Sequence, residues 1–226
     1  MKRLILLMIT CYCLLPGHAN TDIASDSLLQ VLQTLPHDTT RLSTLNDIIK
    51  IEQNNYKCIQ YSDTLMQEAL KLKNDKYASL AAYYHLLYYY NRSEQDSVAK
   101  WIVRMEPYVQ RSGLWDYFFD AQRFQIDLYT FTEQYELAIS EANKMKQKAL
   151  NTNSNRGTVA AYQCLSNAYI GSQRWNEGLK ALEEAYRLLP KKGNAVVHIS
   201  VLSQLVSVTK EMKDNNRQLK YLQELE

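Results

Sequence analysis

The residue types that carry chemistry are not arranged for catalysis in this sequence. After residue 19 there is no His-x-x-x-His or Cys-x-x-Cys spacing of the kind that holds zinc. A phosphate-binding glycine loop, a dinucleotide fingerprint and a Gly-x-Ser-x-Gly nucleophile elbow are also missing. The adjacent carboxylates Glu183 and Glu184 would point in different directions on a helix and cannot act as a pair. We therefore predict that this chain is not an enzyme and holds neither metal nor cofactor.

The most distinctive chemical feature is a dense run of tyrosines from Tyr83 to Tyr90. A tyrosine offers a large contact area together with a hydroxyl, which suits a peptide or protein partner. The same residues suit packing between helices, and helical spacing places Tyr83, Leu87 and Tyr90 at inward positions. Aromatic density alone also leaves a small-molecule or glycan site open as an alternative.

Composition indicates an all-α protein. The chain has 226 residues, of which 46% are hydrophobic and 22% charged, an ordinary globular composition. It contains six Gly and four Pro, so residues that interrupt helices are scarce. Of its cysteines, Cys58 and Cys164 lie far apart in the chain. We expect both to be small buried side chains without a disulfide.

The first nineteen residues have the layout of a secretory signal peptide. Lys2 and Arg3 precede an apolar run from Leu4 to Leu15, and small residues around Ala19 provide a cleavage site. The run is shorter than the roughly 20 residues that a spanning helix needs, so we expect no membrane insertion of the mature chain. The sequence thus predicts a periplasmic or secreted protein, cleaved after Ala19.

Removing this segment leaves a chain without net charge. Lys+Arg falls from 26 to 24 when Lys2 and Arg3 are lost, equal to the 24 Asp+Glu. Nucleic-acid binding requires a basic surface. The charge balance therefore excludes nucleic acid as the expected partner.

Hydrophobic periodicity predicts a lead-in helix within residues 20–37 and then a series of helix pairs over 38–226. Pro107 is expected to kink or shorten its helix, and residues 151–157 look like a polar linker. The predicted pairs span 42–49 with 56–72, 77–90 with 94–111, 115–131 with 133–150, 159–170 with 175–189, and 195–212 with an incomplete run from 217.

The helix pairs repeat. Tyr90, Tyr129 and Tyr169 close the first helices of three pairs, at two spacings that differ by a single position. Nine residues after each comes a small residue, where two helices of a hairpin approach closely: Ala99, Ala138 and Gly178.

The stretch from Val159 to Pro190 shows the repeat most clearly. Tyr162, Leu165, Ser166 and Tyr169 lie on one helical face, and a second helical run starts at Trp175. Its order of large, small and stop residues resembles the tetratricopeptide repeat (TPR) family, whose standard unit has about 34 residues. The resemblance implies a right-handed helical-hairpin solenoid of about four to five repeats of 39–40 residues.

In the TPR family the first helix of each repeat lines a concave groove. The residues that face this groove lie one position after the residues that pack between helices. Carried over to this sequence, the resemblance implies that the groove presents aromatic, amide and charged side chains to a protein or peptide partner. These are Tyr84, Tyr88, Asn91, Arg123, Asp127, Gln163 and Asn167.

The layout is also similar to the periplasmic TPR sensor region of Gram-negative two-component histidine kinases. That likeness implies a sensory or scaffolding part of a signalling system, with any kinase core beyond Glu226. A stand-alone envelope scaffold is the alternative.

Overall fold

The computed structural model describes residues 18–52, 55–189 and 195–225, and within them it contains α-helices and no strands. The prediction of an all-α protein is confirmed. The predicted signal peptide lies outside the described residues except for its last two. The helices are α1 (His18–Thr34), α2 (Thr39–Ile51), α3 (Lys57–Lys71), α4 (Asp75–Tyr90), α5 (Gln95–Ser112), α6 (Trp115–Phe131), α7 (Tyr135–Asn151), α8 (Asn155–Gly171), α9 (Trp175–Arg187), α10 (Ala195–Glu211) and α11 (Asn215–Leu225).

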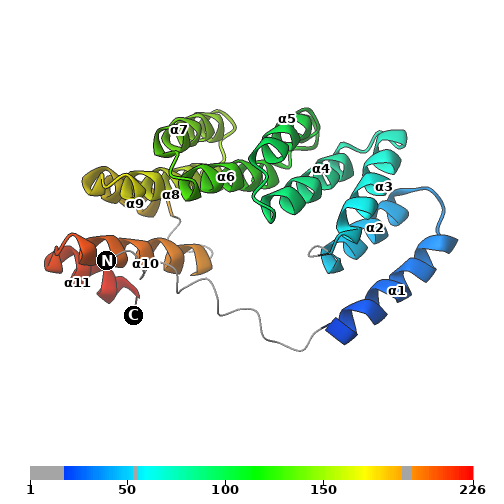
Figure 1. Cartoon of the computed structure of the whole chain (residues 1–226), viewed down its shortest axis with the longest axis horizontal. Helices are drawn as coiled ribbons and strands as arrows, with labels where there is room; N and C mark the ends of the chain where they lie inside the picture. Colours follow the sequence, from blue (N-terminus) through cyan, green and yellow to red (C-terminus); the bar gives the residue numbers. More distant parts are fainter. Residues whose placement is uncertain (1–17, 53–54, 190–194, 226) are drawn as a thin grey trace.

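The helices follow one another along an arc, each packed on its neighbours in sequence (Figure 1). After α1 they form antiparallel hairpins, with α2, α4, α6, α8 and α10 as first helices and α3, α5, α7, α9 and α11 as second helices. First helices also pack on first helices, α2 on α4, α4 on α6 and α6 on α8. No helix in the described ranges is long and apolar enough to cross a membrane.

The turns between helices recur at one constant interval. Among the described residues, the backbone has a positive φ at Lys73, Ser93, Gly113, Glu133, Asn153, Gln173 and Lys213, all between 51° and 75°. At six of these turns the next residue donates its N–H to a carbonyl five residues earlier, as in Asn74 to Ala69 at 2.8 Å. That bond and the left-handed residue together define a Schellman motif, which closes a helix at its C-terminus. Two intervals make one repeat of about 40 residues, a length within the range of known helical-hairpin repeats.

The residue after the left-handed position also starts the next helix at several turns. The Asn74 side chain accepts from the N–H of Tyr77 at 3.3 Å, and Ser154 accepts from Gly157 at 3.0 Å. One short turn therefore ends one helix and caps the next. The prediction of a polar linker over 151–157 is wrong for this reason, because its polar residues are caps and the first turn of α8.

Pro107 does not shorten its helix, contrary to one of the two expected outcomes. α5 continues through Pro107 to Ser112. Proline deprives the carbonyl four residues earlier, that of Val103, of its donor. Because Pro107 and Val103 are both exposed, water can satisfy that carbonyl.

The core is a series of overlapping clusters rather than one centre. One spans α1 to α4, the largest spans α4 to α9, and a third spans α8 to α11. Cys58 and Cys164 are free and buried, as predicted. The small residue of the fourth hairpin is required by space, since a Cβ on Gly178 would lie 2.7 Å from the Ile170 side chain of α8.

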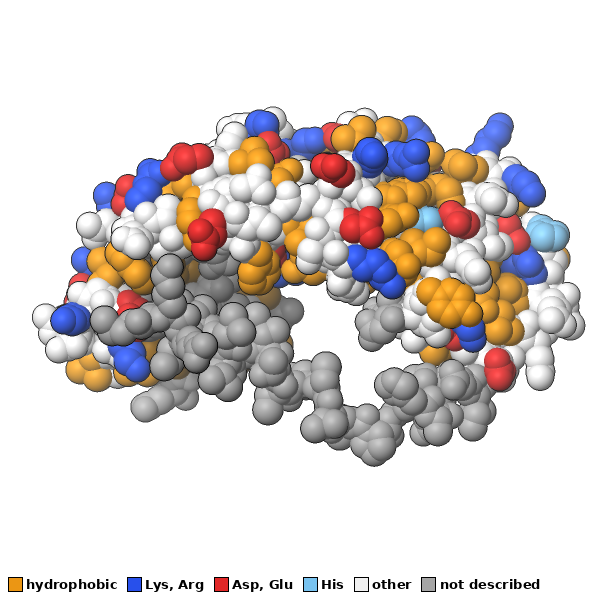
Figure 2. Space-filling model, in the orientation of Figure 1, with side chains coloured by type: hydrophobic (Ala, Val, Ile, Leu, Met, Phe, Trp, Pro, Cys, Tyr) orange, Lys and Arg blue, Asp and Glu red, His pale blue; other side chains and the backbone are white. Residues whose placement is uncertain are grey.

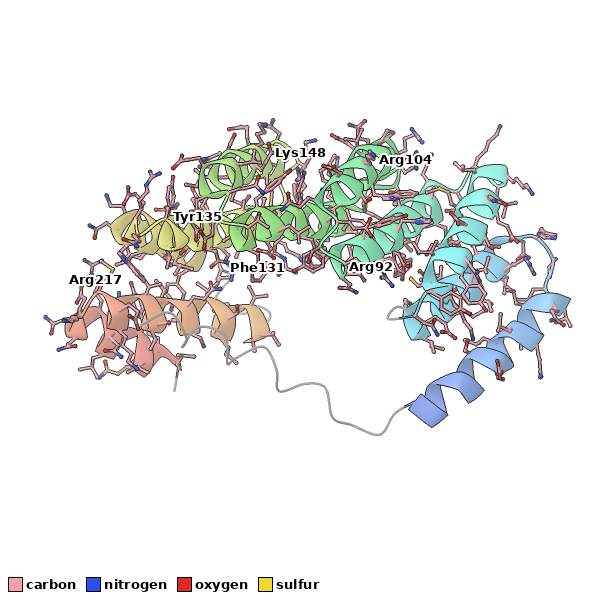
Figure 3. All side chains as sticks on the ribbon, viewed as in Figure 1. Arg92, Arg104, Phe131, Tyr135, Lys148 and Arg217 are labelled. Carbon is pink, nitrogen blue, oxygen red and sulfur yellow. The ribbon has the colours of Figure 1, made fainter. Side chains whose placement is uncertain are left out.

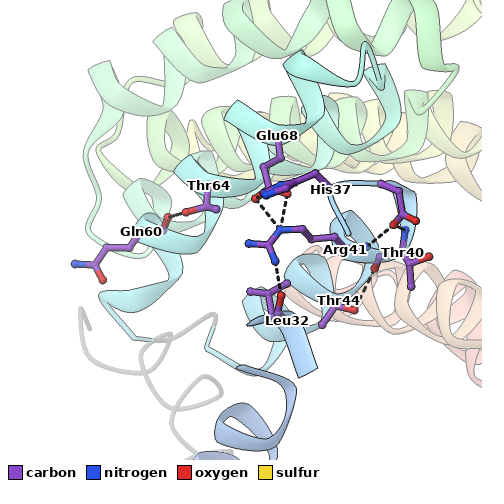
Figure 4. Close-up of polar contacts among 9 residues, drawn as sticks. Leu32, His37, Thr40, Arg41, Thr44, Gln60, Thr64 and Glu68 are labelled. Atoms are coloured by element: carbon purple, nitrogen blue, oxygen red, sulfur yellow. Dashed lines mark hydrogen bonds and ion pairs between the residues drawn. The ribbon is translucent and has the colours of Figure 1, made fainter. Parts of the chain in front are cut away.

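Polar contacts around Arg41 join the first three helices (Figure 4). The Arg41 Nε donates to both carboxylate oxygens of Glu68 on α3, each at 2.9 Å, and its guanidinium also donates to the carbonyl of Leu32 at the end of α1. Asp38 caps α2 by accepting from the N–H of Thr40 at 2.8 Å. The half-buried Arg41 thus attaches the lead-in helix to the first hairpin.

We predict that Gln173→Gly stabilises the protein. Gln173 is exposed and has a φ of 65°, a conformation that costs an L-residue about 1–2 kcal/mol. Glycine avoids that cost but loses more backbone entropy on folding, so the free energy of unfolding should rise by about 0.5–1 kcal/mol in a urea titration.

The control is Ser140→Gly, at an exposed position inside α7. There the same residue should lower the free energy of unfolding by about 1 kcal/mol. Equal effects at the two positions would show that the left-handed turns carry no strain.

Candidate functional site

A pocket of about 600 Å³ lies between the first helices α6, α8 and α10. Successive first helices pack tightly as far as α8, whereas α10 packs mainly on α9 and α11. Space therefore remains between α8 and α10. The pocket is lined by Asp120, Arg123, Asp127, Asn155, Arg156, Val159, Ala160, Gln163, Cys164, Asn167, Leu189, Val196, Val197, His198, Ser200 and Gln204.

Gln163 bridges the space between α8 and α10. Its side-chain amide donates to Gln204 Oε1 at 3.2 Å and to Ser200 Oγ at 3.5 Å. Both acceptors belong to α10, so amide contacts take the place of the apolar packing that joins the earlier first helices.

Four of the seven predicted groove residues line this one pocket: Arg123, Asp127, Gln163 and Asn167. They come from two helices in adjacent hairpins, at equivalent positions of the repeat. The structure therefore brings together the part of the prediction that rested on α6 and α8.

The other three predicted residues, all from α4 and its end, do not line the pocket. Tyr84 is buried, with 5% of its surface exposed, and its hydroxyl donates to Asn46 Oδ1 of α2 at 3.0 Å. Tyr88 is half-buried, and the guanidinium carbon of Arg92 lies 3.4 Å from the centroid of the Tyr88 ring. Asn91 is exposed and follows the last residue of α4. The prediction that Tyr84 is exposed in the groove is wrong.

The error arose because the alignment of the repeats was shifted by one residue in the hairpin of α4 and α5. Aligning Tyr90 with Tyr129 and Tyr169 gave two unequal spacings, whereas the turns are evenly spaced throughout. The equivalent of Tyr129 and Tyr169 is Tyr89, because the carbonyls of all three accept the bond that closes the helix, at 2.8–3.1 Å. Three consecutive tyrosines concealed the shift. In the corrected register, Tyr83 and not Tyr84 matches Arg123.

A half-buried aromatic group lies beside the pocket, built by α4 and α6. The Tyr83 ring is edge-on to Tyr117 at 5.0 Å, and the Tyr90 ring stacks on Phe124 at 4.4 Å between centroids. Burial raises the pKa of Tyr83 to about 12, so its hydroxyl stays protonated. The sequence interpretation missed Phe124 and Tyr117. We call these four residues the aromatic group.

Arg123 connects the aromatic group to the pocket. Its guanidinium carbon lies 5.1 Å from the Phe124 ring centroid, and its side chain lines the pocket. Asp127, one turn further along α6, is half-buried. Burial raises the pKa of Asp127 to about 6, and the positive charge of Arg123 offsets only part of that shift.

Other charges of the pocket are paired. Arg156 Nη2 donates to Asp120 Oδ2 at 2.8 Å, and Arg156 Nη1 lies 3.6 Å from Asp116 Oδ2. Burial raises the pKa of the Asp120 carboxyl, and Arg156 opposes that shift. Cys164, at the base of the pocket, is 1% exposed, and burial raises the pKa of its thiol far above the ordinary value.

His85 is a packed side chain outside the pocket. It is 3% exposed and stacks on Trp101 at 4.0 Å between centroids, with Nε2 at 3.1 Å from Asp63 Oδ1. Burial lowers the pKa of His85. Across the described residues, no group of three or more His, Cys, Asp or Glu is placed to hold a metal ion.

The outer surface differs from the pocket. Figure 3 shows Arg104 and Lys148 on the second helices α5 and α7. On the opposite side of the array lie Arg92, in the turn after α4, and Phe131, the last residue of α6. Acidic and basic side chains are mixed over the face in Figure 2 and no area of one sign dominates it.

No family model matches the chain, and no curated protein matches it.

We predict that Tyr84→Phe lowers stability without changing the pocket. The change leaves the Asn46 side chain, which is 7% exposed, without its donor. An unsatisfied buried polar group costs about 1–3 kcal/mol, measured as a loss in the free energy of unfolding. An unchanged stability would mean that the Tyr84 hydroxyl and Asn46 do not bond.

We predict that Asp127→Asn stabilises the protein at pH 7 and has little effect at pH 3.5. The pKa of Asp127 is higher in the folded chain than its ordinary value of 3.8. The contribution of this carboxyl to the free energy of unfolding is therefore fully present below about pH 4 and is lost as the pH rises through about 6. Asparagine removes this loss, which amounts to about 2 kcal/mol after allowance for partial exposure.

The measurement is a set of urea titrations from pH 3.5 to 7.5 for both proteins. The exposed residue Asp96 on α5 provides the control Asp96→Asn, which should not show this pH dependence. A constant difference between Asp127→Asn and the unchanged protein at all pH values would contradict the assignment.

Proposed function

We propose that this protein is an exported TPR solenoid that binds a partner protein or an extended peptide along its first helices. The support for the TPR assignment is the pairing of helices, the even spacing of the turns and the small residue at Gly178. This repeat is longer than the standard TPR unit of about 34 residues. The right-handed superhelix belongs to the same proposal.

One observation carries the binding function: Arg123, Asp127, Gln163 and Asn167 line a single pocket on the side of the first helices. Beside it, the aromatic group offers four half-buried rings, three of which carry a hydroxyl. Aromatic and arginine side chains at the centre of an interface commonly supply most of its binding energy. A peptide would place an apolar side chain on the aromatic group and polar groups in the pocket.

The biological setting of the proposal is signalling. We propose that the chain is the sensory or scaffolding part of a histidine kinase type of system, with binding in the periplasm as the input. This rests on the layout of residues 1–19 followed by a helical array. The alternative, a stand-alone envelope scaffold, uses the same surface.

Peptide selection on the purified chain tests the binding surface. Peptides chosen from a random library should bind the chain, and Arg123→Ala and Gln163→Ala should each weaken them at least about tenfold, as expected for central interface residues. Affinity is measured by calorimetry, and helicity by circular dichroism.

The controls are Arg104→Ala and Asn143→Ala, at exposed positions on α5 and α7. They should leave affinity unchanged. Loss of affinity in these controls, with normal binding by Arg123→Ala, would move the binding surface to the second helices. Failure to select any peptide would contradict peptide binding altogether.

A further inference from the structure

Arg123 and Asp127 are half-buried opposite charges that line one pocket without pairing. They stand four residues apart on α6, a spacing at which side chains are neighbours on the surface of a helix. Within the described part of the chain, no hydrogen bond or close ion pair joins them or engages either with another residue. Arg123 lies instead over the Phe124 ring.

Opposite charges three residues apart form ion pairs elsewhere in the described chain. Lys144 and Glu141 lie 2.7 Å apart, Arg174 and Glu177 3.1 Å, and Arg187 and Glu184 2.6 Å. The side chain of the basic member of each pair is at least 40% exposed. Arg123 and Asp127 differ from exposed charges at the same spacing, such as Asp96 and Lys100 on α5, because both are half-buried at the pocket.

Arg123 and Asp127 are also the charged residues of the pocket that no other described side chain pairs with or hydrogen-bonds. Arg156 is held by Asp120 and Asp116, and Gln163 by Gln204 and Ser200. Among the described lining residues, Arg123 then presents an uncommitted guanidinium and Asp127 an uncommitted carboxylate. Holding a half-buried charge without a partner costs stability, and binding sites commonly carry such a cost.

We propose that this pocket binds a small zwitterion, which places an ammonium group against Asp127 and a carboxylate against Arg123. Free amino acids and short peptides with free termini share this chemistry. A guanidinium binds a carboxylate through two parallel hydrogen bonds, and an ammonium group can donate up to three to a carboxylate and its neighbours. A pocket of about 600 Å³ lies within the range of about 300–1,000 Å³ for small-molecule sites.

Neighbouring groups suit the rest of such a ligand. Asn167 is exposed at the pocket and its amide can donate and accept. Val159, Ala160 and Val197 provide apolar contacts for a side chain. This inference goes beyond the proposed function and does not rest on it, because it needs no protein partner.

The first experiment compares ligands that differ only at their ends. Alanine and trialanine are titrated into the full chain by calorimetry at pH 7.5, alongside forms with an acetylated amine, an amidated carboxylate, or both. At least one zwitterion should bind with a dissociation constant of about 1 mM or lower. Blocking either end should weaken it at least about tenfold, because each removes a charged hydrogen bond.

The two parent compounds separate the sources of the chemistry. Binding of alanine identifies a free amino acid as the ligand class, and binding of trialanine alone identifies a peptide. Equal binding of the free and blocked forms, or no binding by any compound, would overturn the proposal. Neither of these two overturning results would contradict the capture of a longer peptide, which also uses the aromatic group.

The second experiment assigns each end to a residue. Arg123→Gln should remove the preference for a free carboxylate and keep the preference for a free amine, and Asp127→Asn should do the reverse. A merely structural role would weaken all ligands alike. Arg104→Gln and Asp96→Asn, both exposed on α5, are the matched controls and should leave both preferences intact.

The third experiment uses pH. Below about pH 6 Asp127 is protonated, so the ammonium contact should be lost between pH 7.5 and 5 in the unchanged protein but not in Asp127→Asn. The groups that face Asp127 are Arg123 on α6, Tyr90 on α4, Cys164 on α8, and His198 across the pocket on α10. The variant His198→Gln replaces the imidazole that lines the pocket. Affinity independent of pH in that variant would overturn the role of Asp127.

Discussion

The structure depends on one backbone constraint, the left-handed residue that closes seven of the described helices. It recurs at a constant interval in the described chain from Lys73 to Lys213, with residues 190–194 outside that part. Because the same short turn closes most of the helices, the helices from α4 onwards start at equal intervals and their equivalent side chains come into register. Most of these positions are not glycine, so the array tolerates a modest cost at each turn in exchange for a regular repeat.

The fold was largely predictable from sequence, because helical periodicity and scarce Gly and Pro are local signals. The bounds of α6 and the start of α9 were predicted to the residue. Errors arose where two signals coincide: the polar run 151–157 serves as cap and first turn, and the tyrosines at 88–90 allow two alignments. The even spacing of the turns and the hydrogen bond to the Tyr89 carbonyl distinguish these alignments, and no residue type records either of them.

The candidate site was predictable in part. A repeat places equivalent residues on one side, so Arg123, Asp127, Gln163 and Asn167 could be grouped in advance. The pocket itself was not predictable, because it arises from how α10 packs on α9 and α11 rather than on α8. Nor could the sequence reveal that Arg123 and Asp127 stay apart, since residues at this spacing are neighbours on a helix and can either pair or face a cavity separately.

Neighbour-to-neighbour packing also bears on how the molecule opens. A chain of overlapping clusters has no single centre whose loss unfolds everything, so its end hairpins can open while the middle stays folded. The pocket takes one wall from α10, in the last described hairpin, and two from α6 and α8. Any molecule held there would slow amide hydrogen exchange in α10 and α11 first, so occupancy would be reported as local protection at one end of the array.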